Sequence, residues 1–153
     1  MIIGDSSALV ALSIMNQLDL LKTVFSSIHV PQAVYDEVTI SSKPQSRKLK
    51  KFLKDKITSV EINISQMGLG RGELEAIALY KDINADFLLI DDRRAKSFAK
   101  LNDVNVIGSI GVMILAKELG KVETIREDLE KLLNSDVFIS KSLISRVLIS
   151  VGE

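Results

Sequence analysis

Acidic residues follow two apolar segments of the chain, at the points where each segment is expected to end. Asp91 and Asp92 follow residues 87–90, and Asp5 follows residues 1–4. A short apolar run bounded by polar residues predicts a buried strand, and ligands bind at the carboxyl ends of parallel strands. Adjacent carboxylates repel each other unless a cation or a hydrogen-bond donor lies near them. The pattern therefore predicts an acidic site that binds a metal ion.

The residue types limit which metal ion this is. The chain has no cysteine and a single histidine, His29, which excludes thiolate and histidine-rich sites and disfavours a Ser-His-Asp triad. Carboxylate oxygens favour Mg²⁺ or Mn²⁺. Because such an ion can activate a bound water molecule by itself, no histidine base is required. His29 lies in an expected strand, where a structural role is the simpler interpretation.

Length and composition predict one globular domain over residues 1–153. The formal net charge is zero, so the molecule as a whole does not attract nucleic acid. The sequence shows no apolar run of about 18 residues and no basic segment before an N-terminal apolar stretch. We therefore expect no membrane helix and no signal peptide. With the absence of cysteine, this favours a cytoplasmic protein.

Strand-like and helix-like segments alternate along the chain. Strands are expected at residues 1–4, 28–30, 57–62 (at a sheet edge), 86–90 and 104–107. Helices are expected at residues 6–14, 18–25, 32–38, 46–56, 73–82, 95–101, 109–119, 122–133 and 140–151, with a glycine-bearing loop at 65–72. The alternation predicts an α/β fold with helices on both faces of a mostly parallel sheet of about five strands. The helix at 109–119 is almost wholly apolar and is expected to be buried.

Further acids lie on the expected helices. Glu37 lies in the helix that follows Pro31, and Glu73 and Glu75 begin the helix before the strand at residues 86–90. Each acid alone has a simpler explanation, which is helix capping for Asp5 and a solvated helix face for Glu37 and Glu75. The acids considered together favour a common site.

Basic side chains accompany the acids. Arg71, Arg93 and Arg94 are placed to bind phosphate in a bidentate manner, or to balance the charge of the aspartates. Residues 43–56 carry seven positive side chains, including Lys48 and Lys51, which suits a phosphate backbone as well as a solvated helix face. Aromatic residues are few, so no base-stacking platform is evident.

Four segments of the chain together resemble the PIN domain. They are Asp5-Ser6-Ser7-Ala8-Leu9, Val30-Pro31-Gln32-Ala33-Val34-Tyr35-Asp36-Glu37-Val38, Gly70-Arg71-Gly72-Glu73-Leu74-Glu75-Ala76-Ile77 and Leu89-Ile90-Asp91-Asp92-Arg93-Arg94-Ala95. Residues 107–112 and 116–120 resemble, more narrowly, a prokaryotic PIN-like family of unknown function. The resemblance extends over essentially the whole chain.

The resemblance implies a three-layer α/β/α fold and a metal-dependent nuclease. By position, the catalytic acids are Asp5, Glu37, Glu73 and Asp92, and the metal ligands are Asp5, Glu73, Asp91 and Asp92. Glu73 stands where related toxins have aspartate, and its longer side chain alters the distance to a metal. Glu75 is a rival for this place, although it points away from the direction of Glu73. Ser6 matches a hydroxyl that neighbours the first acid in the family and serves equally as a helix cap.

The same resemblance implies an endoribonuclease that cuts single-stranded or structured RNA. Many PIN domains are toxins of the VapC type, whose activity is masked by an antitoxin protein over the acidic cleft. The apolar helix at 109–119 and the two helices after it make a homodimer plausible, although burial within one monomer explains them as well.

Two other classes of protein remain open. The glutamate at position 73 and the neutral net charge are compatible with a PIN-like module that binds nucleic acid with little or no catalysis. An aspartate-phosphorylating fold is disfavoured: a response-regulator-like domain needs a lysine where Gly108 follows the strand, and a haloacid-dehalogenase-like phosphatase needs an aspartate where Ser7 stands.

Overall fold

The described residues, 1–62 and 68–153 of the computed structural model, form a four-stranded sheet at the centre of the molecule. Its strands are β1 (Ile2–Gly4), β2 (Ile28–His29), β3 (Phe87–Leu89) and β4 (Val106–Ile107), in the spatial order β2-β1-β3-β4. Each neighbouring pair of strands is parallel. The expected α/β class with a parallel central sheet is confirmed.

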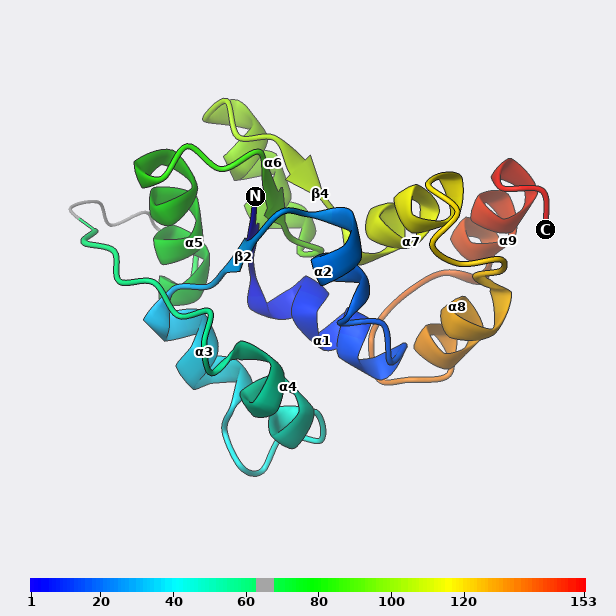
Figure 1. The fold of residues 1–153 in the computed structure, drawn as a ribbon, viewed down its shortest axis with the longest axis horizontal. Coiled ribbons are helices and arrows are strands. Elements are labelled where there is room, and N and C mark those ends of the chain that lie inside the picture. Colours follow the sequence, from blue (N-terminus) through cyan, green and yellow to red (C-terminus); the bar gives the residue numbers. More distant parts are fainter. Residues whose placement is uncertain (63–67) are drawn as a thin grey trace.

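Helices connect and cover the strands. In chain order they are α1 (Ser6–Ile14), α2 (Leu20–Val24), α3 (Gln32–Val38), α4 (Ser46–Leu53), α5 (Arg71–Asp82), α6 (Arg93–Leu101), α7 (Ser109–Glu118), α8 (Arg126–Leu133) and α9 (Lys141–Ser150). Figure 1 shows α7, α8 and α9 together at one end of the molecule, with α3, α4 and α5 towards the other.

The sheet has a hydrophobic cluster on each face. Ile2 and Ile3 are adjacent in β1 and both fully buried, and their side chains point to opposite faces. Ile2 belongs to the larger cluster, with residues of α1–α4 and α7–α9, whereas Ile3 packs with residues of α5 and α6. Leu88 and Leu89 of β3 divide between the two clusters in the same way. This is the three-layer α/β/α arrangement.

The register of the central strands brings their acidic ends together. Gly4 of β1 lies opposite Leu89 of β3, and the Asp5 amide donates a 2.9 Å hydrogen bond to the Leu89 carbonyl. Asp91 and Asp92 lie 86 and 87 residues after Asp5 in the chain, and all three therefore follow neighbouring strands at one edge of the sheet.

The strand expected at residues 57–62 is reduced to a single parallel bridge between Val30 and Ile57. The reason lies in its partner, because Pro31 has no N–H group and directly precedes α3. The β2 segment therefore offers no further backbone for pairing. Of the loop expected at 65–72, residues 65–67 lie outside the described part, and Arg71 and Gly72 already belong to α5.

Several helix bounds differ from expectation by a few residues; the helix expected at residues 46–56, for example, ends at Leu53. The helix expected from residue 122 begins at Arg126, after an irregular segment. On α7, Val112, Met113 and Ala116 are buried, but Ile110 and Ile114 are only partly so. The expected complete burial of this helix is wrong, because one of its faces lines an open cavity.

Candidate active site

A cavity of about 1320 Å³ lies at the carboxyl edge of the sheet. The carboxylates of five acids line it, namely Asp5, Glu37, Glu73, Asp91 and Asp92. All the acids of the expected catalytic and metal-binding set therefore border one space. Four basic residues line the same cavity, namely Lys43, Arg71, Arg93 and Lys96.

Asp5 is the most buried of these acids. Only 3% of it is exposed, and it caps α1, with Oδ2 accepting hydrogen bonds from the Ser7 amide (3.1 Å) and the Ser7 hydroxyl (2.7 Å). Burial, with a smaller contribution from the charge of Glu73, raises the pKa of Asp5 from 3.8 to about 6, against the lowering effect of the Ser7 hydrogen bonds. Asp5, the first acid of the expected catalytic set, therefore caps helix α1 and is also a carboxylate largely removed from water.

Ser7 connects the two acidic strand ends. Its hydroxyl donates to Asp5 and accepts hydrogen bonds from the backbone amides of Asp91 (3.0 Å) and Asp92 (3.2 Å). Sequence reasoning gave weight to the neighbouring Ser6 and overlooked this residue. The available signal was weak, because a serine in the first turn of a helix is common for reasons of capping alone.

Asp91 and Asp92 have different surroundings. Both oxygens of Asp91 are bound by Ser109, Oδ1 by its amide (2.9 Å) and Oδ2 by its hydroxyl (2.6 Å), so this carboxylate holds the start of α7. A Cβ atom on Gly108 would lie 2.6 Å from Asp91 Oδ1, so this contact requires glycine there. Asp92 is exposed and caps α6 through a 2.8 Å hydrogen bond from the Ala95 amide to Oδ1. Both residues line the cavity, and of the two only Asp92 has a carboxylate oxygen without a partner among the described contacts.

Glu37 is linked to the other acids through Ser6. The Ser6 hydroxyl donates a 2.8 Å hydrogen bond to Glu37 Oε2, and Lys43 forms an ion pair with Oε1 at 3.8 Å. Gly72 of α5 lies against the same carboxylate, and a Cβ atom there would be 3.4 Å from Oε2. The packing of α3 against α5 thus brings Glu37 to the helix that carries Glu73.

Glu73 and Glu75 differ in burial and partners. Glu73 lies in the first turn of α5, and its carboxylate accepts a hydrogen bond from the Gly70 amide. Glu75 is only 4% exposed and accepts hydrogen bonds from the Ala33 amide of α3 (3.0 Å) and Arg71 Nε (2.7 Å). The interpretation of Glu75 as a solvated side chain is wrong, because it satisfies the N-terminus of α3.

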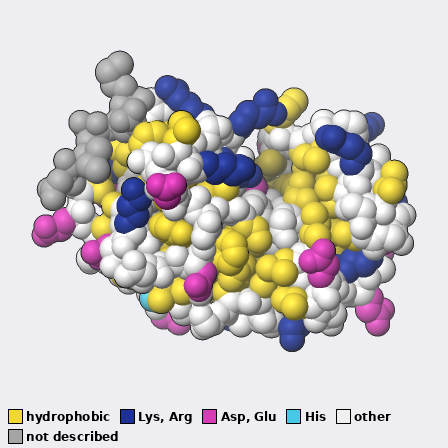
Figure 2. Space-filling model, turned by 90° about the horizontal axis from the view of Figure 1, so that it is seen from above, with side chains coloured by type: hydrophobic (Ala, Val, Ile, Leu, Met, Phe, Trp, Pro, Cys, Tyr) yellow, Lys and Arg dark blue, Asp and Glu magenta, His cyan; other side chains and the backbone are white. Residues whose placement is uncertain are grey.

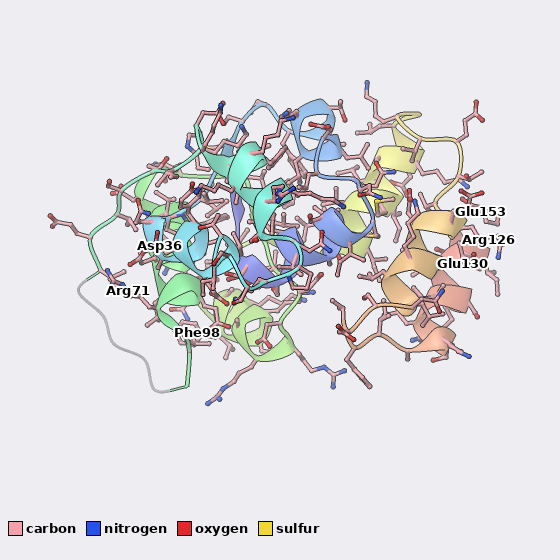
Figure 3. All side chains as sticks on the ribbon, turned by 90° about the horizontal axis from the view of Figure 1, so that it is seen from below. Asp36, Arg71, Phe98, Arg126, Glu130 and Glu153 are labelled. Carbon is pink, nitrogen blue, oxygen red and sulfur yellow. The ribbon has the colours of Figure 1, made fainter. Side chains whose placement is uncertain are left out.

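The expected phosphate-binding residues separate into two groups. Arg71 and Arg93 line the cavity, and Figure 3 shows Arg71 at the start of α5, near the helix that carries Asp36. The structure places three others away from the cavity lining. Arg94 packs against Gly68, Lys48 donates to Asn16 Oδ1 (2.7 Å), and Lys51 is exposed on α4. Lys96, which sequence reasoning did not single out, lies one helical turn after Arg93.

The ligand types at this site suit a hard divalent cation, but the side-chain positions of the described residues are not arranged around one. Its ligands would be carboxylate oxygens, and the charge of Asp5 is disfavoured by burial and by Glu73, which a cation would offset. In the side-chain arrangement of residues 1–62 and 68–153, no three His, Cys, Asp or Glu side chains converge closely enough to hold an ion. The hydrogen bonds of Glu73 to Gly70 and of Asp92 to Ala95 occupy oxygens that binding would use.

Comparison with known proteins gives one match. A family model described as a PIN domain matches residues 1–153. No curated protein and no solved structure matches the chain. Within the described residues, no helix is long and apolar enough to cross a membrane.

Proposed function

The chain belongs to the PIN-domain family, and from this we propose that it is a metal-dependent endoribonuclease that hydrolyses RNA phosphodiester bonds. PIN domains are generally nucleases, and membership of this family therefore supports hydrolase activity. The observation that carries the ribonuclease proposal is the shared cavity, which the buried Asp5 lines together with four other acids and four basic residues. A phosphodiester bound in this cavity lies near carboxylates that can bind a metal ion and near basic side chains that can bind the phosphate oxygens.

In this proposal, Asp5, Glu73 and Asp92 hold Mg²⁺ or Mn²⁺, with Asp91 setting the position of Asp92. Such an ion, when bound, lowers the pKa of a water molecule and offsets the charge that develops on the phosphate. Ser7 fixes the Asp5 carboxylate through Oδ2. Glu37 is oriented by the Ser6 hydroxyl and completes the acidic set.

The basic side chains bind the substrate. Arg71 lines the cavity, and its Nε atom donates a hydrogen bond to the buried Glu75, which orients the guanidinium group. Arg93 and Lys96, in the first turn of α6, line the same cavity. These residues orient the phosphate oxygens. Lys48 and Lys51 lie on α4, outside the cavity lining, and would contact the RNA strand beyond the scissile phosphate.

The likeness to VapC-type toxins supports a further part of the proposal. The protein acts in the cytoplasm as the toxin of a toxin–antitoxin pair, and an antitoxin protein blocks the acidic cavity. The partly exposed apolar side chains of α9, such as Leu143 and Ile149, support a homodimer through the C-terminal helices.

A second candidate is a PIN-like module that binds nucleic acid without cutting it. The specific observation in its favour is that the longer Glu73 side chain bonds back to the Gly70 amide in place of the shorter aspartate of the toxins. This contact occupies one of the two Glu73 oxygens.

One experiment separates the two candidates. A pool of single-stranded and structured RNA is incubated with the protein in EDTA, Mg²⁺ or Mn²⁺, and cleavage is followed by gel electrophoresis. We expect metal-dependent cutting that Asp5→Asn, Asp92→Asn and Glu37→Gln abolish. The matched control is Asp36→Asn, on the same helix as Glu37 but bonded to Gln32 and outside the cavity lining. RNA binding without cleavage would establish the binding module, and equal cutting by all variants would show contamination.

A further inference from the structure

Phe138 is the most exposed large apolar side chain in the described part of the molecule. It lies between α8 and α9, and 99% of its surface is exposed. It also lines the cavity that holds Asp5 and Asp92. An aromatic ring left in solvent beside the acidic site is a feature that the nuclease chemistry itself does not use.

The backbone around Phe138 holds the ring outward. Val137 and Ile139, on either side of it, are partly buried and pack against the larger hydrophobic cluster. The Val137 amide donates to the Ser135 hydroxyl (3.2 Å), which in turn donates to the Leu132 carbonyl (2.7 Å). Because the neighbours on both sides are anchored, the outward position of Phe138 is prearranged.

The cavity beside Phe138 has an apolar end. Ile110 and Ile114 of α7 and Leu143 of α9 line the same cavity as the acidic and basic residues. Figure 2 shows hydrophobic side chains gathered around a hollow whose other rim carries Lys and Arg side chains. At about 1320 Å³, the cavity exceeds the roughly 300–1,000 Å³ that a small-molecule ligand fills. There is room for more than one nucleotide, with phosphate at one end and bases at the other.

We propose that Phe138 is a base-stacking residue, which binds an unpaired base next to the phosphate held at the acids. This inference rests on the proposed nuclease function and assigns its substrate class as single-stranded RNA. Bases in a duplex are stacked on each other and present no free face, whereas splayed bases stack on aromatic rings. The cavity offers an apolar surface for the aromatic base of a nucleotide and basic side chains for its charged phosphate.

The first test measures binding in the non-cleaving Asp5→Asn background, using a fluorescent single-stranded RNA and a fully paired duplex of the same sequence. Phe138→Ala is expected to weaken binding of the single strand by about 5-fold to 150-fold and to leave duplex binding unchanged. Phe138→Leu, which keeps an apolar side chain without a ring face, is expected to lose affinity like alanine, and Phe138→Trp to retain it. Leu101→Ala is the matched control, because Leu101 is 84% exposed on α6 and does not line the cavity.

The second test uses the fact that the chain contains no tryptophan. Phe138→Trp therefore places a single tryptophan at the proposed stacking position, and Leu101→Trp places one at the control position. Single-stranded RNA is expected to quench the fluorescence at position 138 and leave it unchanged at position 101. Inorganic polyphosphate, which has the charge but no bases, is expected to quench neither.

The outcomes separate this inference from the proposed function. If the wild-type protein cuts RNA but Phe138→Ala binds and cuts the single strand as well as wild type, stacking is overturned and the nuclease stands. If the wild-type protein neither binds nor cuts RNA, both are overturned. If the fluorescence at position 138 depends on protein concentration, and Phe138→Ala dissociates a dimer without affecting RNA binding, Phe138 belongs to a protein interface.

Discussion

The Ser7 hydroxyl donates a 2.7 Å hydrogen bond to Asp5 Oδ2 while it accepts the backbone amides of Asp91 and Asp92. One side chain thus joins the acid that follows β1 to the acids that follow β3. Register alone brings these strand ends together, but it leaves the carboxylate free to rotate. Ser7 removes that freedom, so the geometry of the acidic cavity depends on a residue that carries no charge.

Ser7→Ala is expected to reduce both stability and cleavage. It leaves two backbone amides without an acceptor, which costs about 1–3 kcal/mol of the free energy of unfolding. It also removes the hydroxyl hydrogen bond that lowers the pKa of Asp5 against burial, so that pKa rises further, while the bond from the backbone amide at position 7 remains. Urea unfolding and the pH profile of cleavage measure the two effects, and the acidic limb of the profile should move to higher pH. Ser6→Ala, which loses a single exposed bond to Glu37, is the control, and equal stability of both variants would contradict the assignment.

Asp5→Asn is expected to stabilise the protein at neutral pH. Burial raises the folded-state pKa of Asp5 to about 6, above its ordinary 3.8. The folded protein therefore binds this proton more tightly than the unfolded chain, and the Asp5 contribution to stability falls as pH rises from about 3.8 to about 6. The shift corresponds to at most about 3 kcal/mol at pH 7.5.

Thermal or urea unfolding of wild type and Asp5→Asn between pH 3.5 and pH 7.5 measures this difference. We expect Asp5→Asn to be the more stable at pH 7.5 and the two proteins to converge near the acidic end. Adding Mn²⁺ at pH 7.5 should stabilise the wild type and leave Asp5→Asn unchanged. A less stable Asp5→Asn at pH 7.5 would show that the buried charge is compensated in the folded protein.

Substitutions of the adjacent acids Asp91 and Asp92 are expected to have different effects, on stability in the first case and on cleavage in the second. Asp91→Ala leaves the buried Ser109 amide and hydroxyl without acceptors and should lower the free energy of unfolding by about 1–3 kcal/mol. Asp92→Asn retains a good helix cap and removes the charge, so it should leave stability nearly unchanged and abolish metal-dependent cleavage. Chemical unfolding and the RNA assay on both variants check this, and a reversed pattern would exchange the two roles.

Glu153 is expected to stabilise the C-terminal helices in a pH-dependent manner. Its carboxylate accepts hydrogen bonds from Lys117 and from the amides of Ile125 (2.8 Å) and Arg126 (3.0 Å), and Figure 3 shows it beside Arg126 at the start of α8. Burial alone would raise the pKa of Glu153, but these hydrogen bonds outweigh it and hold the pKa below the ordinary 4.5. Its contribution is therefore present above pH 4.5 and is lost as pH falls through the lowered pKa.

Glu153→Gln should lower the melting temperature at pH 7, and the difference from wild type should shrink below pH 4.5. Glu130→Gln, which changes an exposed glutamate on α8, is the control and should have little effect at either pH. A difference that does not change with pH would mean that the carboxylate acts by packing and not by charge.

The order of the elements and the acids at their ends could be predicted from the amino-acid sequence alone. Apolar runs of fixed length and alternating periodicity depend on local composition, so the strands at Ile2–Gly4 and Phe87–Leu89 and the positions of Asp5 and Asp92 could be read directly. Which acids have a structural role depends on contacts between elements that are distant in the chain, and these are visible in the folded protein. Glu75 is buried because α3 packs on α5, and Asp91 is bound because α7 begins beside β3. The same holds for the shortened pairing at Ile57, the start of α8 at Arg126 and the outward ring of Phe138, since each depends on a partner that is distant in the chain or on how its neighbours pack.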